Sequence, residues 1–303
     1  MSDAIEINNV TKSFGNFVAV NDLSLRVPRN TIYGFIGPNG SGKTTTLRMI
    51  MRIYAPDSGH LKVLGEEIFQ AYSDKISYLP EERGLYKNMK VKELIRFFAR
   101  LKNVRNCDAD IESWLDRMGL LDWQNKRVDT LSKGMSQKVQ FISAVIAKPE
   151  LLILDEPFSG LDPTNRTVMQ DAILSLRKAG TTVIFSTHDM SVAEKMCDFI
   201  FMIHKGRKVL DGTLQQIQDT YGLDTLKVQL EGESPNLYGL SGVEKITDFG
   251  NAQELRLARN TDTQAILGEL MRRGRVRHFE ITKPSLQDIF VRIATPESEN
   301  ASP

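Results

Sequence analysis

One segment near the N-terminus, residues 31–50, limits the possible folds of this chain more than any other. Its sequence, TIYGFIGPNGSGKTTTLRMI, predicts a strand over Thr31–Ile36, a glycine-rich turn, and a helix from about Lys43. The turn fits the pattern G-x-x-x-x-G-K-[ST] through Gly37, Gly42, Lys43 and Thr44. A strand, this turn and a helix in succession indicate an α/β fold with a phosphate-binding loop.

The glycine-rich turn predicts a site for phosphate groups and a metal ion. Its glycines let consecutive amides curl around phosphate oxygens, Lys43 neutralises the outer phosphates, and Thr44 offers a hydroxyl to Mg²⁺. The alternative is a chance glycine-rich loop, which the strand before it and the helix after it disfavour. The other candidate binding residues of this loop are Asn39, Gly40, Ser41 and Thr45.

A second apolar segment, LLILDEP at 151–157, predicts a buried strand that ends in two acids. At the carboxyl end of such a strand, Asp155 can hold Mg²⁺, usually through water, and Glu156 can polarise an attacking water. An ordinary strand followed by an acidic turn is the alternative for this segment alone. The phosphate loop in the same chain disfavours that alternative.

A third predicted strand, TTVIFSTHD at 181–189, ends close to His188. A lone histidine at a strand end is more often structural than catalytic. Here the strand is expected in the same parallel sheet, whose carboxyl ends bind ligands. We therefore expect His188 to lie beside the terminal phosphate.

The stretch LSKGMSQ at 131–137 predicts a second anion site. An apolar periodic run follows it, with Val139, Ile142 and Ile146 on one helical face, and Ser132 is a plausible N-cap of that helix. The amides and the positive dipole end of such a helix attract anions.

The bulk composition excludes several classes of protein. A length of 303 residues predicts about two domains. A net charge of +1 predicts no nucleic-acid partner. No run approaches the roughly 18 apolar residues of a membrane-spanning helix. The two cysteines, Cys107 and Cys197, lack metal-ligand spacing and are expected to be reduced core residues.

Five motifs in this order and spacing resemble those of the nucleotide-binding subunit of ABC transporters: GPNGSGKT, LSKGM, LLILDEP, SGLD and STHD. The resemblance covers roughly residues 4–220. It implies an α/β, P-loop NTPase (RecA-like) core with an antiparallel β subdomain and a helical subdomain at about 85–148, forming a domain over 1–220. The implied activity is that of a Mg²⁺-dependent ATPase with ATP and Mg²⁺ as cofactors.

The same resemblance explains why a second anion site is needed. Two such domains dimerise head to tail, so Ser132 and the amide of Gly134 would bind the γ-phosphate of the ATP held by the other copy. Asp162 in SGLD would link the two sites, or it caps a helix before Pro163, and the two roles can coexist. Whether the dimer is homomeric or heteromeric stays open.

The resemblance also implies a base-binding edge. In KSFGNFVAV, Phe14 would stack on adenine and Val20 would flank the base. The alternative for Phe14 is an edge position in the core.

Two departures from the family pattern point to a subgroup within the family. Glu81 replaces the usual glutamine after Pro80, so it either reaches the metal shell or is held away, for example by Arg83. The family's signature motif, here LSKGM at 131–135, has Lys133 and Met135 where glycine and glutamine are usual. With EERGLY, these departures resemble ABC-2 type exporters that include sodium-efflux and drug-resistance ATP-binding proteins.

This subgroup implies a partner and a location. The chain would power a separate ABC-2 type transmembrane permease from the cytoplasmic face of the inner membrane, as a peripheral subunit. Candidate docking residues are Leu85, Tyr86 and Met89, with ordinary packing as the alternative. A soluble ABC ATPase acting on ribosomes or chromosomes is the rival interpretation. A regulatory module without turnover is a second rival, which an intact Glu156 disfavours.

Residues 221–295 predict a small α+β accessory domain without a catalytic constellation. Alternating segments at 225–230, 243–249, 254–259 and 275–281 predict strands, and 263–273 and 285–294 predict helices, the last capped by Ser285. The basic run at 272–278 could contact lipid phosphates, but a solvated face is the usual outcome. Residues 296–303 are expected to form a frayed tail.

Overall fold

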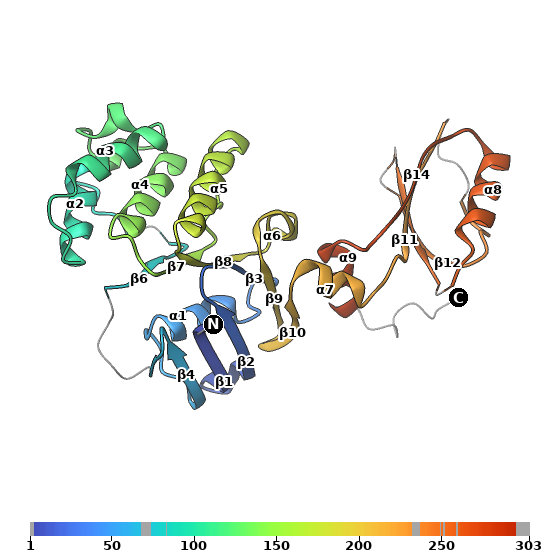
Figure 1. The fold of residues 1–303 in the computed structure, drawn as a ribbon, viewed down its shortest axis with the longest axis horizontal. Coiled ribbons are helices and arrows are strands. Elements are labelled where there is room, and N and C mark those ends of the chain that lie inside the picture. Colours follow the sequence, from blue (N-terminus) through green and yellow to red (C-terminus); the bar gives the residue numbers. More distant parts are fainter. Residues whose placement is uncertain are drawn as a thin grey trace. The chain divides into compact units, whose positions relative to one another are not determined.

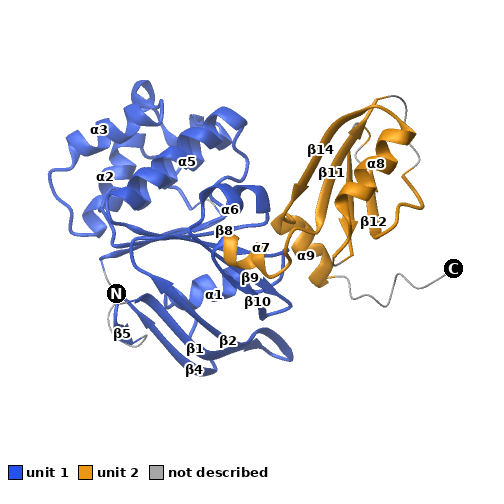
Figure 2. Ribbon diagram, turned by 45° about the vertical axis from the view of Figure 1, so that its right-hand side comes forward, with its two compact units in different colours: residues 1–214 blue, residues 215–303 orange. Residues whose placement is uncertain are grey.

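The structure, a computed structural model, describes residues 3–67, 74–82, 84–231, 237–248, 250, 252–258 and 260–294. The chain forms two compact units, residues 1–214 and 215–303 (Figure 2). The sequence placed this boundary after residue 220, whereas the structure groups most of helix α7 (Leu214–Asp219) with the second unit.

The centre of the first unit is a six-stranded sheet of order β10-β9-β3-β8-β7-β6 within the described residues. Strands β9, β3, β8, β7 and β6 are parallel, and β10 is antiparallel to β9. Every residue of β3, β7 and β8 is buried, which explains why these strands are continuous apolar runs in the sequence. The bounds are β3 (Ile32–Ile36), β6 (Ile76–Leu79), β7 (Leu151–Asp155), β8 (Thr182–Thr187), β9 (Phe199–His204) and β10 (Arg207–Gly212).

A second, antiparallel sheet packs on one side of the central sheet (Figure 1). Its order is β2-β1-β4-β5, and helix α1 (Lys43–Ile50) shares its apolar core. The P-loop NTPase core with an antiparallel β subdomain is therefore confirmed. The bounds are β1 (Asp3–Phe14), β2 (Phe17–Pro28), β4 (Ser58–Val63) and β5 (Glu66–Glu67).

Helices cover the other side of the central sheet (Figure 1). Helices α2 (Val91–Leu101), α3 (Asp108–Arg117) and α4 (Lys133–Val145) lie within the predicted helical subdomain. Helices α5 (Pro163–Lys178) and α6 (Met190–Met196) follow β7 and β8. The apolar faces of these helices form one hydrophobic core with β7 and β8.

The second unit is built on an antiparallel sheet of order β12-β13-β11-β14. Ile266 and Leu270 of helix α8 (Thr263–Arg273) pack on its apolar face. The predicted helix cap is confirmed, because Ser285 Oγ accepts a hydrogen bond from the Asp288 amide at 3.1 Å. The other elements are β11 (Thr225–Leu230), β12 (Val243–Asp248), β13 (Gln253–Leu257), β14 (Val276–Thr282) and α9 (Leu286–Ala294).

The arginines of the basic run at 272–278 form ion pairs with acids of the same unit. Arg272 and Arg273 pair with Glu269, and Arg275 and Arg277 pair with Glu231. This arrangement matches the solvated face that was the usual expectation. The predicted tail at 296–303 lies outside the described residues.

Candidate functional site

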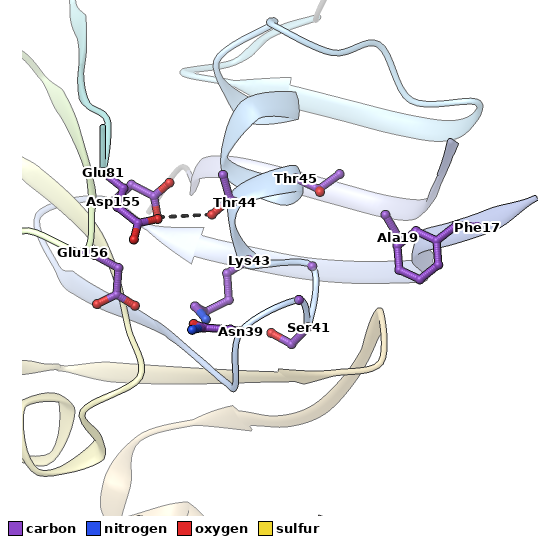
Figure 3. Close-up of a pocket in the computed structure, with 12 residues that line it drawn as sticks. Phe17, Ala19, Asn39, Ser41, Lys43, Thr44, Thr45, Glu81, Asp155 and Glu156 are labelled. Atoms are coloured by element: carbon purple, nitrogen blue, oxygen red, sulfur yellow. Dashed lines mark hydrogen bonds between the residues drawn. The ribbon is translucent and has the colours of Figure 1, made fainter. Parts of the chain in front are cut away.

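A pocket of about 330 Å³ lies where α1 meets the carboxyl ends of the central strands. Figure 3 shows the phosphate loop on one side of it and the two acids at the end of β7, Asp155 and Glu156, on the other. All predicted loop residues except Gly37 line it. The lining residues are Phe17, Ala19, Asn39, Gly40, Ser41, Gly42, Lys43, Thr44, Thr45, Glu81, Asp155 and Glu156.

Two glycines of the loop are required by close backbone approaches. Gly37 and Gly42 have φ angles of 149° and 110°, in the region that favours glycine. A Cβ atom at Gly37 would lie 2.2 Å from the carbonyl oxygen of Ile203, and one at Gly42 would lie 2.6 Å from that of Ala19. Strands β9 and β2 therefore hold the loop from behind, and its open side faces the pocket.

Lys43 is the first residue of α1, and its side chain folds back onto the loop. Its Nζ donates to the carbonyl oxygens of Gly37 at 2.7 Å and Pro38 at 3.1 Å. Burial lowers the pKa of Lys43, and the charges of Glu156 and Asp155 oppose that shift. The ammonium group is thus already removed from water at the position where phosphates would need it.

Ser41 supplies the test of whether the loop fits phosphate groups. Its side chain is 3% exposed, and its Oγ has no hydrogen-bond partner in the described part of the chain. A buried hydroxyl without a partner costs free energy unless a ligand satisfies it. A phosphate oxygen in the curled loop would supply that partner.

Asp155 is held at the end of β7 by three hydroxyl groups. Its Oδ1 accepts from Ser186 at 2.5 Å and from Thr44 at 3.4 Å, and its Oδ2 accepts from Tyr78 at 3.3 Å. Thr44 and Asp155 thus place two oxygen ligands side by side, the type that Mg²⁺ prefers. Sequence reasoning missed Ser186 and Tyr78; only the position of Ser186 in the STHD motif was a signal.

Burial shapes the pKa of the groups around Asp155. Desolvation and the nearby Asp155 charge raise the pKa of Tyr78 to about 12, so its hydroxyl stays protonated and can donate. Burial also raises the pKa of Glu156, while the hydrogen bond and charge of His188 oppose that shift.

Glu156 and His188 face one another across the strand ends. Glu156 has a positive φ of 49°, and its amide donates to Ser186 Oγ at 3.0 Å. His188 Nδ1 lies 3.0 Å from Glu156 Oε1, and the His188 side chain is 65% exposed. His188 therefore orients the carboxylate from the rim, without lining the pocket itself.

Glu81 lies on the pocket wall, next to Asp155 in Figure 3. Its negative charge acts to raise the pKa of both Lys43 and Glu156. Arg83, the predicted ion-pair partner, lies outside the described residues. Glu81 thus lines the same pocket as Thr44 and Asp155, and its role in a metal shell stays a prediction.

The base-binding edge at Phe14 and Val20 stays a prediction, and other residues of the same hairpin line the pocket. Phe17 and Ala19 line the pocket, whereas Phe14 and Val20 do not. Phe14 and Phe17 close the β1–β2 hairpin, and the Phe14 ring packs edge-on against Tyr54 at 5.2 Å. Val20 is fully buried in the core that the antiparallel sheet shares with α1.

Comparisons with known proteins agree with this geometry. The ABC transporter family model matches residues 20–159, and a model of the C-terminal domain of DrrA1-3-like ATP-binding proteins matches residues 212–294. The uncharacterized ABC transporter ATP-binding protein YhaQ of Bacillus subtilis is 40% identical over 95% of this chain and 97% of its own length. The chain belongs to the ABC transporter ATP-binding proteins.

Further relatives have names that refer to resistance or export. The daunorubicin resistance ATP-binding protein DrrA3 of Streptomyces coeruleorubidus is 31% identical over 96% of this chain and 95% of its own. The Nod factor export ATP-binding protein I of Rhizobium etli is 32% identical, over 98% and 95%. A solved ATP-binding subunit of an ABC transporter has a TM-score of 0.69 and 28% identity, over 73% of this chain and 94% of that one. These relatives favour a transport ATPase over the ribosomal or chromosomal alternative.

As an ABC ATPase, the chain binds and hydrolyses ATP. The segment LSKGM, residues 131–135, does not line the pocket that holds Lys43. Ser132 is the N-cap of α4 and accepts a hydrogen bond from the Met135 amide at 3.2 Å. Ser132 and Gly134 are absent from the lining of the pocket that holds Lys43. Asp162 caps α5 and accepts from the Asn165 amide at 2.9 Å, as one of its two predicted roles requires.

A second cavity, a groove of about 380 Å³, is lined by residues of strand β6 and of helices α2 and α4. Leu85 lines it, but Tyr86 and Met89 do not. The ring of Tyr86 packs edge-on against Phe97 at 5.4 Å, and Met89 packs against the helical core. The groove residues are Ser77, Tyr78, Pro80, Gly84, Leu85, Phe98, Leu101, Lys102, Gln140, Ser143 and Ala144.

No helix in the described ranges is both long and apolar enough to cross a membrane.

Proposed function

We propose that this ATPase powers a separate membrane exporter of the ABC-2 type. The names of the relatives DrrA3 and Nod factor export protein I, and the match to a DrrA1-3-like C-terminal domain, support an export role. The chain would work as a peripheral subunit on the cytoplasmic face of the membrane. Its groove beside β6, with Leu85 at its wall, would receive the permease.

The chemistry that we assign to the pocket is positioning and electrostatic stabilisation. Lys43, the loop amides and Ser41 would hold the phosphates. Glu156, oriented by His188, would take the role of the base that orients water. Phe17 and Ala19 stand at the edge where the base of the nucleotide would lie.

Thr44 and Asp155 would hold Mg²⁺, and Glu81 would join its shell directly or through one water. When bound, the ion neutralises phosphate charge. The hydroxyl groups of Ser186 and Tyr78 keep the Asp155 carboxylate turned toward Thr44.

One observation carries the proposal of a head-to-tail dimer. The chain has a nucleotide pocket with its own acids, and a second anion-binding helix start at Ser132 that takes no part in that pocket. A second copy would bring its Ser132 and Gly134 to the γ-phosphate. Each chain would then hold half of two active sites.

A single variant tests the proposal. Purified Glu156→Gln should bind ATP, lose hydrolysis, and elute as a dimer with ATP and Mg²⁺ but as a monomer with ADP. The parent should hydrolyse ATP with Mg²⁺ and fail to do so with EDTA. A Glu156→Gln protein that hydrolyses ATP at the parental rate, or that stays monomeric with ATP, would refute the assignment.

A further inference from the structure

One glutamine of helix α4, Gln140, is bonded to the segment that carries Glu81. Its side-chain nitrogen Nε2 donates to the carbonyl oxygen of Pro80 at 3.3 Å and to that of Glu82 at 3.4 Å. A side-chain amide nitrogen has two N–H groups, so one proton is available for each carbonyl group. The two hydrogen bonds therefore hold the backbone on both sides of Glu81 against α4.

Burial distinguishes Gln140 from an ordinary surface glutamine. The residue is 7% exposed, and its Oε1 has no hydrogen-bond partner in the described part of the chain. A buried polar atom without a partner costs free energy, and an apolar side chain would avoid that cost. The stability of the helical core alone therefore does not explain a glutamine at this position.

The segment that Gln140 holds follows directly after strand β6. Residues 80–82 belong to no helix or strand. Within the described residues, the two bonds from Gln140 are the side-chain hydrogen bonds that reach the backbone of this segment. Glu81 is exposed, and it lines the nucleotide pocket together with Thr44 and Asp155. The place of its carboxylate thus depends on where Gln140 holds the backbone.

We propose that Gln140 is a positioning residue that keeps Glu81 at the magnesium site. The inference rests on the proposed magnesium–ATP site and deepens it. Removing a hydrogen-bond partner of a metal ligand typically lowers metal affinity by about 10- to 100-fold. Gln140 bonds to the backbone beside Glu81 and not to its carboxylate, so we expect a smaller effect. Because α4 begins beside Ser132, the helix that would meet the partner's γ-phosphate also supports Glu81 of its own chain.

The first experiment tests the hold on residues 80–82 in EDTA, without nucleotide. Glu81 and Glu82 are both exposed, so a glutamyl endopeptidase can reach them. Gln140→Met keeps an unbranched side chain but cannot donate. This full-length variant should be cut after Glu81 or Glu82 about two- to tenfold faster than the parent, as the loss of one net hydrogen bond would give. Ser143→Ala is the matched control and should be cut at the parental rate, because Ser143 donates to Val139 of α4 itself.

The second experiment asks whether this hold affects the metal site. The affinity for a fluorescent, non-hydrolysable ATP analogue would be measured in Mg²⁺ and in EDTA, and the ratio of the two affinities gives the effect of magnesium. Gln140→Met and Gln140→Ala should lower this ratio at least about threefold, with the affinity in EDTA unchanged. In a Glu81→Ala background, the same substitutions should have no further effect, because the residue that they position is gone.

The outcomes separate the inference from the proposed function. If magnesium does not strengthen binding in the parent, the proposed magnesium site is wrong, and the inference is wrong with it. If magnesium strengthens binding equally in the parent and in both Gln140 variants, or if cleavage after Glu81 and Glu82 is not faster in these variants, Gln140 does not position Glu81. If the variants lower the affinity ratio equally with and without Glu81, Gln140 supports the general fold and not this carboxylate.

Discussion

The starts of helices α1 and α4 show how similar local chemistry gives different sites. Each helix begins with a lysine next to glycine, Lys43 in α1 and Lys133 in α4. The α1 start has no side-chain cap, whereas Ser132 caps α4. Lys43 is buried against its own loop, but Lys133 is exposed and its stem lies over Gly160.

The difference lies in what surrounds each helix start. The α1 start faces Asp155 and Glu156 at the end of β7, which would supply a metal ligand and a base. The α4 start does not line that pocket, and the Ser132 hydroxyl already accepts a hydrogen bond from the Met135 amide. A helix start is therefore a complete site only where the sheet adds carboxylates, and otherwise it needs a second molecule.

The largest expected effect comes from removing the base from the α1 site. Glu156→Gln keeps the shape of the side chain and removes its negative charge. General-base catalysis contributes about 10²- to 10⁴-fold, so the ATPase rate should fall at least about a hundredfold with ATP affinity retained. Steady-state phosphate release and filter binding of ATP would measure both. Parental turnover would place the base elsewhere.

A mixture of two variants tests whether the two helix starts act in different chains. Lys43→Ala should lose ATP binding, and Ser132→Arg should bind ATP but fill the space meant for the partner's γ-phosphate. Neither variant by itself should dimerise when ATP is added. In a mixed dimer, the phosphate loop of the Ser132→Arg chain meets Ser132 of the Lys43→Ala chain, so one site stays intact and binds one ATP. Light scattering and bound nucleotide would be measured. ATP-dependent dimers of either single variant would contradict the head-to-tail arrangement.

Substitutions of Glu81 test whether a third carboxylate contributes to magnesium-dependent hydrolysis at the α1 site. Glu81→Gln keeps an oxygen for the metal shell and should retain much of the hydrolysis, with half-maximal activity at a different Mg²⁺ concentration. Glu81→Ala should reduce stimulation by the membrane subunit more than basal activity. Both rates would be compared in vesicles with and without the permease. Equal rates in the parent and Glu81→Ala would leave Glu81 as a surface acid.

The smallest effect concerns the cap that only α4 possesses. Ser132→Ala should lower the free energy of unfolding by about 1 kcal/mol, while Ser132→Gly should lower it by only a few tenths. Urea unfolding of the first unit would separate the two. If Ser132→Ala unfolds at the parental urea concentration, the hydrogen bond to the Met135 amide adds no stability.

Sequence reasoning succeeded where chemistry is local. The loop from Gly37 to Thr44 and the acids after β7 follow from short patterns, because neighbouring residues build them. Phe17 was missed: it lines the pocket, whereas Phe14, its register partner across the hairpin, packs against Tyr54. Tyr78 was missed as well, because its hydrogen bond joins residues 77 positions apart. Only tertiary packing of β6 beside β7 creates that bond.

The buried ammonium of Lys43 has a further consequence for the stability of the fold. This cation is desolvated and donates hydrogen bonds to neutral carbonyl groups, which costs folding free energy. An apolar side chain of similar length, as in Lys43→Met, should raise the melting temperature while abolishing nucleotide binding. The chain would then illustrate a stability–activity trade-off, in which a side chain that binds phosphate costs folding free energy.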